Sequence, residues 1–283
     1  MQKKNLVLII GVLAFGFILG LNVRWFDQKE FINENRFSLP NSVQRKPEPV
    51  SPTQRVPEGW GFVKSRDGKT PEITVRQKQL IKKYGALFVG NTGKKQVTLT
   101  FDMGYEKEGL TPAMLDTLKK HNVKASFFVT AHWLRSNREL AKRMVADGHL
   151  LGNHTCSHKS LPTLSEEKIK AEIRGWENVA KEVTGSLPKY KYMRPPMGEY
   201  SEKSLRVTQE LGYTTAFWSI AMRDWMPMGG AHKAVEGVVN YLHNGAVVLL
   251  HGNSEEVVQG LEQIILQTRA KGFKIVPIYE IDK

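Results

Sequence analysis

The chain has 283 residues, of which 41% are hydrophobic and 24% are charged, an ordinary balance for a globular protein with room for one large domain and its extensions. Its 41 Lys and Arg against 28 Asp and Glu give a net charge of +13, which suits an acidic wall polymer or a membrane surface and also fits general solubility. No basic and aromatic motif typical of nucleic-acid binding stands out, so we expect no nucleic-acid partner, and the single cysteine, Cys156, excludes a disulfide framework.

The first 23 residues predict a membrane signal-anchor. Lys3 and Lys4 precede an uncharged run from Asn5 to Val23, which as a helix is about 28 Å long at about 1.5 Å per residue, close to the hydrocarbon thickness of a bilayer. A cleaved signal peptide is the alternative, although its nearest cleavage site, residues 14–16, lies inside the apolar run. With both lysines inside, the rest of the chain faces the outside of a cell membrane, or is secreted if cleavage occurs.

Residues 24–58 predict a tether, because their prolines block regular structure. Residues 59–95 predict an extension that packs on the domain after it, since Trp60 and Phe62 are costly to expose. Within this extension, residues 71–84 have the pattern of a helix.

Strands and helices alternate through residues 96–283, which predicts an α/β domain. The expected strands span residues 97–101, 125–129, 150–153, 192–193, 214–218, 246–250 and 274–277. The expected helices begin at Thr111 or span residues 137–146, 165–183, 201–211, 232–243 and 255–270.

Polar side chains fall at or just after the ends of several of these strands. They are Asp102, His154, Arg194, Asp224 and His251. The carboxyl ends of strands form the active face of a parallel barrel, so this placement favours a distorted or incomplete (β/α) barrel over a doubly wound sheet, which periodicity alone does not exclude. Each residue alone also fits a turn, a cap or a salt bridge, but their order and spacing together indicate a hydrolase.

His154 and His158 are four residues apart and could bind one metal ion from a helical turn or a tight loop. A strand-end carboxylate such as Asp102 could then accept the proton of a metal-bound water. Cys156 lies between the histidines and is a second candidate ligand, but a thiol two residues from His154 points elsewhere. A small buried thiol is the other interpretation.

These motifs resemble the NodB-type polysaccharide deacetylases, carbohydrate esterase family 4, over residues 96–276. The family's Thr-Phe-Asp-Asp motif is Thr-Phe-Asp-Met at residues 100–103, and its His-(Ser/Thr)-x-x-His motif is complete at residues 154–158. Its Arg-x-Pro-aromatic-Gly motif is Arg-Pro-Pro-Met-Gly at residues 194–198. The last two motifs resemble Asp-Trp at residues 224–225 and Leu-Leu-His at residues 249–251.

The run from Thr100 to Glu106 is most similar to the delta-lactam-biosynthetic de-N-acetylases of spore-forming bacteria. That resemblance implies a peptidoglycan substrate, N-acetylmuramic acid, whose freed amine can close a lactam with the lactyl carboxyl group. The sequence departs from the family at Met103, where an aspartate usually completes an Asp-His-His metal site. A thioether is a poor ligand for a hard cation, so we expect a divalent metal, zinc, to be weakly held by His154 and His158.

The resemblance also implies roles for the remaining residues. Asp102 is the expected general base, and Arg194 is expected to pair with it and keep it ionised. His251 is the expected acid that protonates the leaving amine, with Asp224 holding its imidazole. The expected substrate-binding residues are Met197 near the oxyanion, Trp225 and Leu249 around the acetyl methyl group, and Tyr105 along the sugar.

Two alternatives stay open from the sequence. One is a deacetylase of N-acetylglucosamine or chitin-like glycan, because pocket shape decides between these sugars. The other is a non-catalytic wall-binding protein on the same fold, disarmed at Met103. We expect the chain to act as a monomer on the glycan strand.

Overall fold

The computed structural model describes residues 57–283. The predicted anchor, residues 1–23, and almost all of the predicted tether, residues 24–58, lie outside the described residues. Among the helices between residues 57 and 283, none combines the length and apolar character needed to cross a membrane.

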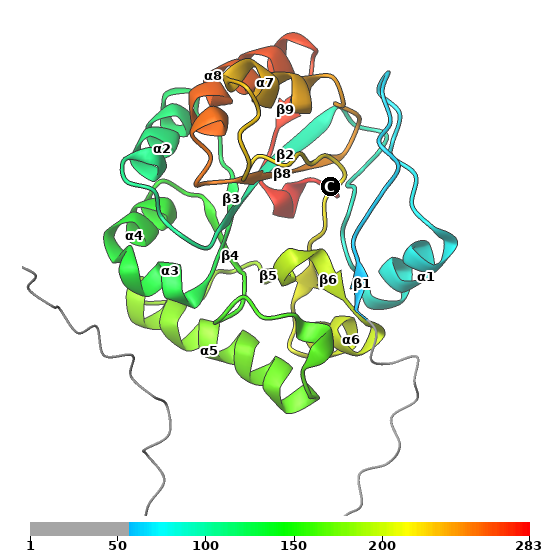
Figure 1. The fold of residues 1–283 in the computed structure, drawn as a ribbon, viewed down its shortest axis with the longest axis vertical. Coiled ribbons are helices and arrows are strands. Elements are labelled where there is room, and N and C mark those ends of the chain that lie inside the picture. Colours follow the sequence, from blue (N-terminus) through cyan, green and yellow to red (C-terminus); the bar gives the residue numbers. More distant parts are fainter. Residues whose placement is uncertain (1–56) are drawn as a thin grey trace, which may run out of the picture. The chain divides into compact units, whose positions relative to one another are not determined.

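A curled parallel sheet of seven strands forms the centre of the fold (Figure 1). The strand order is β7-β5-β4-β3-β2-β8, and β9 also pairs with β2. Their bounds are β2 Gln96–Met103, β3 Ser126–Val129, β4 Leu150–Asn153, β5 Tyr192–Met193, β7 Thr214–Thr215, β8 Ala246–His251 and β9 Lys274–Ile275. Only single bridges such as Ile220–Val248 and Leu87–Ala216 connect the stretch after β7 to its neighbours. The expected incomplete barrel is therefore confirmed as a curled, half-closed parallel sheet.

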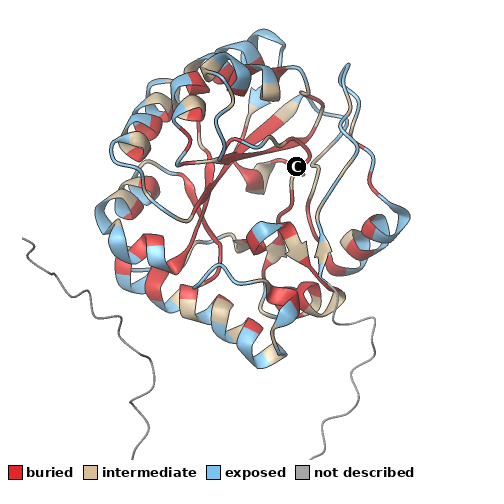
Figure 2. Cartoon of the chain, in the orientation of Figure 1, coloured by how far each residue is buried: buried red, intermediate tan, exposed pale blue. Residues whose placement is uncertain are grey.

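Helices pack around the outside of this sheet, with their buried residues turned toward it (Figure 2). Their bounds are α2 Leu110–Lys120, α3 Ala131–Ser136, α4 Arg138–Ala146, α5 Glu166–Thr184, α6 Glu202–Glu210, α7 Ala231–Val239 and α8 Glu255–Ala270. Ser165 caps α5, its side chain accepting a hydrogen bond from the backbone N–H of Lys168.

Strand β2 packs one of its faces into the larger core. Leu99, Phe101 and Met103 are buried in the larger core, which also contains Met114 of α2 and residues of α8. Because successive side chains of a strand point to opposite faces, Asp102 faces the interior of the curl instead. The register places Asp102 beside His251 of β8, so the two strand ends bring these polar groups together.

Several predicted bounds were wrong. The helix expected at 232–243 ends at Val239, because His243 is fully buried and its Nε2 lies 3.0 Å from Ser219 Oγ, which takes the chain out of the helix. The strand expected at 214–218 has only two residues, after which the backbone N–H of Phe217 turns to the carbonyl of Leu87. Helix α3 was missed because it is short; Thr130 caps it by accepting from the N–H of Trp133.

The segment before the sheet packs against the rest of the domain. Strand β1 (Glu58–Gly59) pairs antiparallel with β6 (Glu199–Tyr200), and helix α1 (Val75–Tyr84) packs on α6. Trp60 stacks on Phe217 at 4.1 Å between ring centroids, and its indole N–H donates to the carbonyl of Trp218 at 2.9 Å. The helix expected at 71–84 starts at Val75, because Thr74 and Gln77 form a capping box before it.

Replacing Gly90 with Ala is expected to destabilise the fold. A Cβ at Gly90 would lie 2.4 Å from the carbonyl oxygen of Ile281, and this backbone cannot move without disturbing the C-terminal core. Overpacking of this kind costs about 1–3 kcal/mol, measurable as a lower urea midpoint. Gly59→Ala is the matched control, since a Cβ there has no atom within 4 Å. Equal midpoints for the two variants would contradict this packing.

Candidate active site

The strand ends open into one cavity of about 1010 Å³, large for a small-molecule site. The predicted residues in its wall are Asp102, Tyr105, His154, His158, Met197, Trp225, Leu249 and His251. Arg194 and Asp224 lie behind this wall, where both are buried. The structure therefore brings all ten predicted residues to one place, eight in the wall and two supporting it.

Arg194 is fully buried and holds Asp102 from behind. Its Nη1 donates to Asp102 Oδ1 at 2.8 Å, and its other nitrogens donate to the carbonyls of Ala216 and Phe217 at 3.1 and 3.3 Å. The guanidinium carbon also lies 4.2 Å from the centre of the Phe128 ring. The pairing expected from the sequence is present, with every side of the guanidinium occupied by protein.

The charge on Asp102 follows from this contact. Burial alone raises the pKa of the carboxyl group, but the positive charge of Arg194, with smaller contributions from His154 and His251, outweighs it and lowers the pKa below its usual value. Asp102 is therefore ionised at neutral pH. Its Oδ1 is engaged by Arg194, while Oδ2 lies 3.7 Å from His154 Nε2.

His154 and His158 lie on a tight loop after β4, not on a helix. Thr155 and His158 both have left-handed backbone conformations, with φ of 67° and 55°. His154 Nδ1 donates to the carbonyl of Arg194 at 2.8 Å, since a carbonyl only accepts, so the Nε2 lone pair is directed toward Asp102. Burial lowers the pKa of His154 to about 4, which keeps the imidazole neutral.

Two supporting residues of this loop were missed from the sequence. The side chain of Asn153 donates to the carbonyl of Ile173 and accepts from the N–H of Thr155. Glu172 of α5 accepts from the backbone N–H groups of Cys156 and Ser157 at 3.0 and 2.9 Å. The contact joins residues 15 and 16 positions apart in the chain, so no local pattern could have predicted it.

His251 and Asp224 form a second pair. His251 Nδ1 lies 2.7 Å from Asp224 Oδ1, and the backbone N–H of His251 donates to Oδ2 at 2.8 Å. Burial alone lowers the pKa of His251, but the hydrogen bond and charge of Asp224 outweigh it and raise the pKa above its usual value. Because a carboxylate only accepts, Nδ1 carries a proton and Nε2 is the nitrogen left for exchange.

The four predicted substrate-binding residues form the outer wall. Met197 and Trp225 are 56% and 57% exposed, Tyr105 is 74% exposed, and Leu249 is buried. The Trp225 ring stands edge-on to His251 at 5.1 Å between centroids. Beside Met197, Gly198 has a φ of +67°, and a Cβ there would lie 2.7 Å from the Trp218 ring, which explains a glycine at the end of this motif.

The donor groups of the site fit a metal ion only in part. His154 and His158 have rings 4.8 Å apart, but residues 57–283 contain no group of three His, Cys, Asp or Glu side chains placed to bind a metal. Met103 does not substitute: it is buried in the core, its sulfur 2.0 Å from where a Cβ of Gly252 would lie. Burial and Glu172 raise the pKa of the Cys156 thiol. Among the described residues, His154 and His158 could therefore bind a metal ion, and its other coordination positions would be left to water or substrate.

Comparison with known proteins agrees with this geometry. A family model for polysaccharide deacetylases matches residues 89–216. The peptidoglycan-N-acetylmuramic acid deacetylase PdaA of Bacillus subtilis is 37% identical over 80% of this chain and 86% of its own. A peptidoglycan-N-acetylglucosamine deacetylase of Bacillus cereus is 34% identical over 70% of this chain and 72% of its own. The solved structure of PdaA, described as a family 4 carbohydrate esterase, superimposes with a TM-score of 0.77 over 80% of this chain and 96% of that one.

Arg194→Met is expected to destabilise the protein by about 3–5 kcal/mol, because it leaves a buried carboxylate without its counter-charge. Without Arg194, burial dominates and the pKa of Asp102 rises above that of the unfolded chain. A raised pKa makes folding less favourable as pH increases, so the loss should be larger at pH 8 than at pH 5. Urea unfolding at both pH values measures it, and a loss independent of pH would contradict the assignment.

Proposed function

This chain belongs to the polysaccharide deacetylase family, carbohydrate esterase family 4, and we propose that it hydrolyses the acetamide of peptidoglycan amino sugars, N-acetylmuramic acid in preference. The main support for the proposal is that two groups in the wall of one cavity have pKa values shifted in opposite directions. Asp102 has a lowered pKa and His251 a raised one, and the two are neighbours in the β2–β8 register. Such a pair is typical of general base and general acid.

Asp102 is the proposed base. Amide hydrolysis begins when water loses a proton as its oxygen attacks the carbonyl carbon. Arg194 fixes Oδ1 and keeps the carboxylate ionised, which leaves Oδ2 to accept that proton. An Asp held in one orientation by a buried arginine loses no freedom in the reaction, which favours turnover.

His251 is the proposed acid. The amine leaves only when protonated, and the raised pKa of His251 maintains a protonated fraction near neutral pH. Asp224 fixes the ring through Nδ1, so the transferable proton is carried by Nε2. Trp225 packs against the ring and, with Leu249, would surround the acetyl methyl group.

His154 and His158 are the proposed holders of a divalent cation, zinc, bound weakly for lack of a third protein ligand. When bound, such an ion polarises the acetamide carbonyl. The hydrogen bond from Nδ1 to the Arg194 carbonyl orients His154 for this purpose. The neutral state that burial imposes on His154 is the one that can bind a metal.

The muramic acid preference is supported by PdaA, which carries that activity in its name and aligns over most of its length. N-Acetylglucosamine is the second candidate, since the Bacillus cereus relative is named for it. We propose further that the domain works outside the cell membrane, on the strength of the apolar run from Asn5 to Val23 after two lysines. A role limited to wall binding is disfavoured, because binding alone requires neither the Asp102–Arg194 pair nor the His251–Asp224 pair.

Asp102→Asn is expected to lower acetate release from peptide-free peptidoglycan by about 10²- to 10⁴-fold, the usual contribution of a general base. The assay uses the purified enzyme without metal and with added zinc, manganese or magnesium. Thermal melting of the variant serves as the folding control. Acetate release at the wild-type rate by the variant would exclude Asp102 as the base, and no release by the wild type under any metal would overturn the proposed hydrolysis.

Asp224→Asn is expected to shift the alkaline limb of the kcat/KM profile to lower pH. The acid form of His251 is needed, so activity falls as pH rises through its pKa. Removing the negative charge of Asp224 removes the main influence that raises this pKa, so the fall begins earlier. An unchanged or upward-shifted limb in the pH profile would argue against His251 as the acid.

A further inference from the structure

The cavity wall contains permanent positive charge that the proposed mechanism does not use. Of the Lys, Arg, Asp and Glu side chains in the wall, Lys64 and Arg223 are the cations and Asp102 is the one anion. Asp102 is paired with Arg194 behind it. Lys64 and Arg223 make no ion pair within residues 57–283, so an anionic group entering the cavity meets two available cations.

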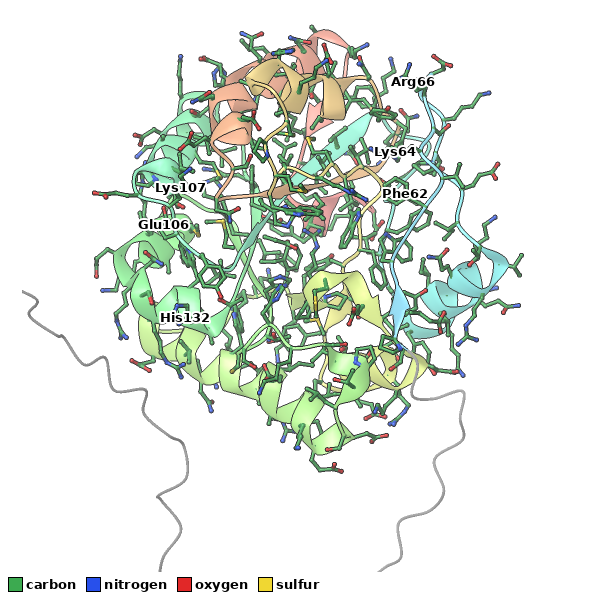
Figure 3. All side chains as sticks on the ribbon, in the orientation of Figure 1. Phe62, Lys64, Arg66, Glu106, Lys107 and His132 are labelled. Carbon is green, nitrogen blue, oxygen red and sulfur yellow. The ribbon has the colours of Figure 1, made fainter. Side chains whose placement is uncertain are left out.

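Lys64 reaches the cavity from outside the barrel. The segment that carries it is held by pairing of Val63 with Glu72 and by Trp60, whose backbone N–H donates to the carbonyl of Gly198. Lys64 Nζ lies 5.2 Å from the centre of the Tyr241 ring, a cation–π distance, and Tyr241 is outside the cavity wall, so the lysine side chain turns from this ring toward the cavity when it binds an anion. Figure 3 shows Phe62 and Lys64 on one side of the molecule and His132 on the other, and all three line the cavity.

Arg223 lies at the acid end of the site. It directly precedes Asp224, whose carboxylate holds both the ring and the backbone of His251. The Arg223 side chain is exposed at the cavity wall, and the same wall includes Met222 and Ala221 beside it. Arg223 and His251 line the same cavity, so one bound sugar can contact both side chains.

We propose that Lys64 and Arg223 bind the lactyl carboxylate of muramic acid, and so select muramic acid that carries no stem peptide. This inference rests on the proposed function and names its specificity residues. Muramic acid differs from glucosamine by a lactyl ether at O3, whose carboxylate is anionic when free and becomes a neutral amide when a peptide is attached. An arginine can form a bidentate hydrogen bond with a carboxylate, and a lysine contributes a point charge. The pair therefore binds the free lactyl carboxylate more tightly than the neutral amide.

The test compares two glycans on three variants. The substrates are peptide-free peptidoglycan strands and a chitooligosaccharide, which lacks the carboxylate. Lys64→Gln and Arg223→Gln should each raise KM for the peptide-free strands about fivefold, with kcat and the chitooligosaccharide KM little changed. Lys69→Gln removes an exposed lysine of the same segment outside the cavity wall and is the control.

Binding is measured separately from turnover, so that the two proposals can fail independently. Calorimetry on the Asp102→Asn protein with peptide-free strands should show about fivefold weaker binding when Lys64→Gln is added, and recovery with Lys64→Arg. Equal binding with and without Lys64→Gln, or the same loss for the chitooligosaccharide, overturns the carboxylate site. Wild-type protein that binds the strands through Lys64 but releases no acetate from them instead overturns the proposed function.

Discussion

The buried ion pair between Arg194 and Asp102 is the constraint on which the site depends. A guanidinium without solvent exposure is tolerated only when its donors and its charge are satisfied, and here one carboxylate and two carbonyls, those of Ala216 and Phe217, do so. Those carbonyls follow β7, at one edge of the sheet, whereas Asp102 is the penultimate residue of β2, which lies between β3 and β8. The pair therefore requires the sheet to curl until the end of β2 meets the segment after β7.

The Arg194–Asp102 pair also fixes the positions of the residues around it. The carbonyl of Arg194 orients His154, so the base and the histidine loop share one support. Trp218 follows the Phe217 carbonyl and leaves room beside it only for a glycine, Gly198. Trp60 then covers Phe217 and donates to the Trp218 carbonyl. The segment before the sheet is thus fixed to the same centre, and it carries Lys64 to the cavity.

The sequence predicted the parts that depend on local pattern. Apolar strands with polar ends and amphipathic helices could be predicted, because the spacing of apolar residues is a property of residues close together in the chain. The gathering of Asp102, His154, Arg194 and His251 was predictable because strand ends in parallel folds share an edge. The missed features are long-range: Glu172 under the histidine loop and Lys64 in the cavity wall. No periodicity records which distant residue fills a given space.

The most direct test of the account is the pKa of Asp102 itself. Selective labelling of aspartate carboxyl carbons, with Asp102→Asn to assign the resonance, allows its titration to be followed by NMR. Because the charge of Arg194 outweighs burial, we expect the Asp102 carboxylate to stay ionised from pH 8 down through about pH 4, the ordinary aspartate pKa. A carboxyl group that takes up its proton near neutral pH would contradict the assignment of Asp102 as an arginine-supported base.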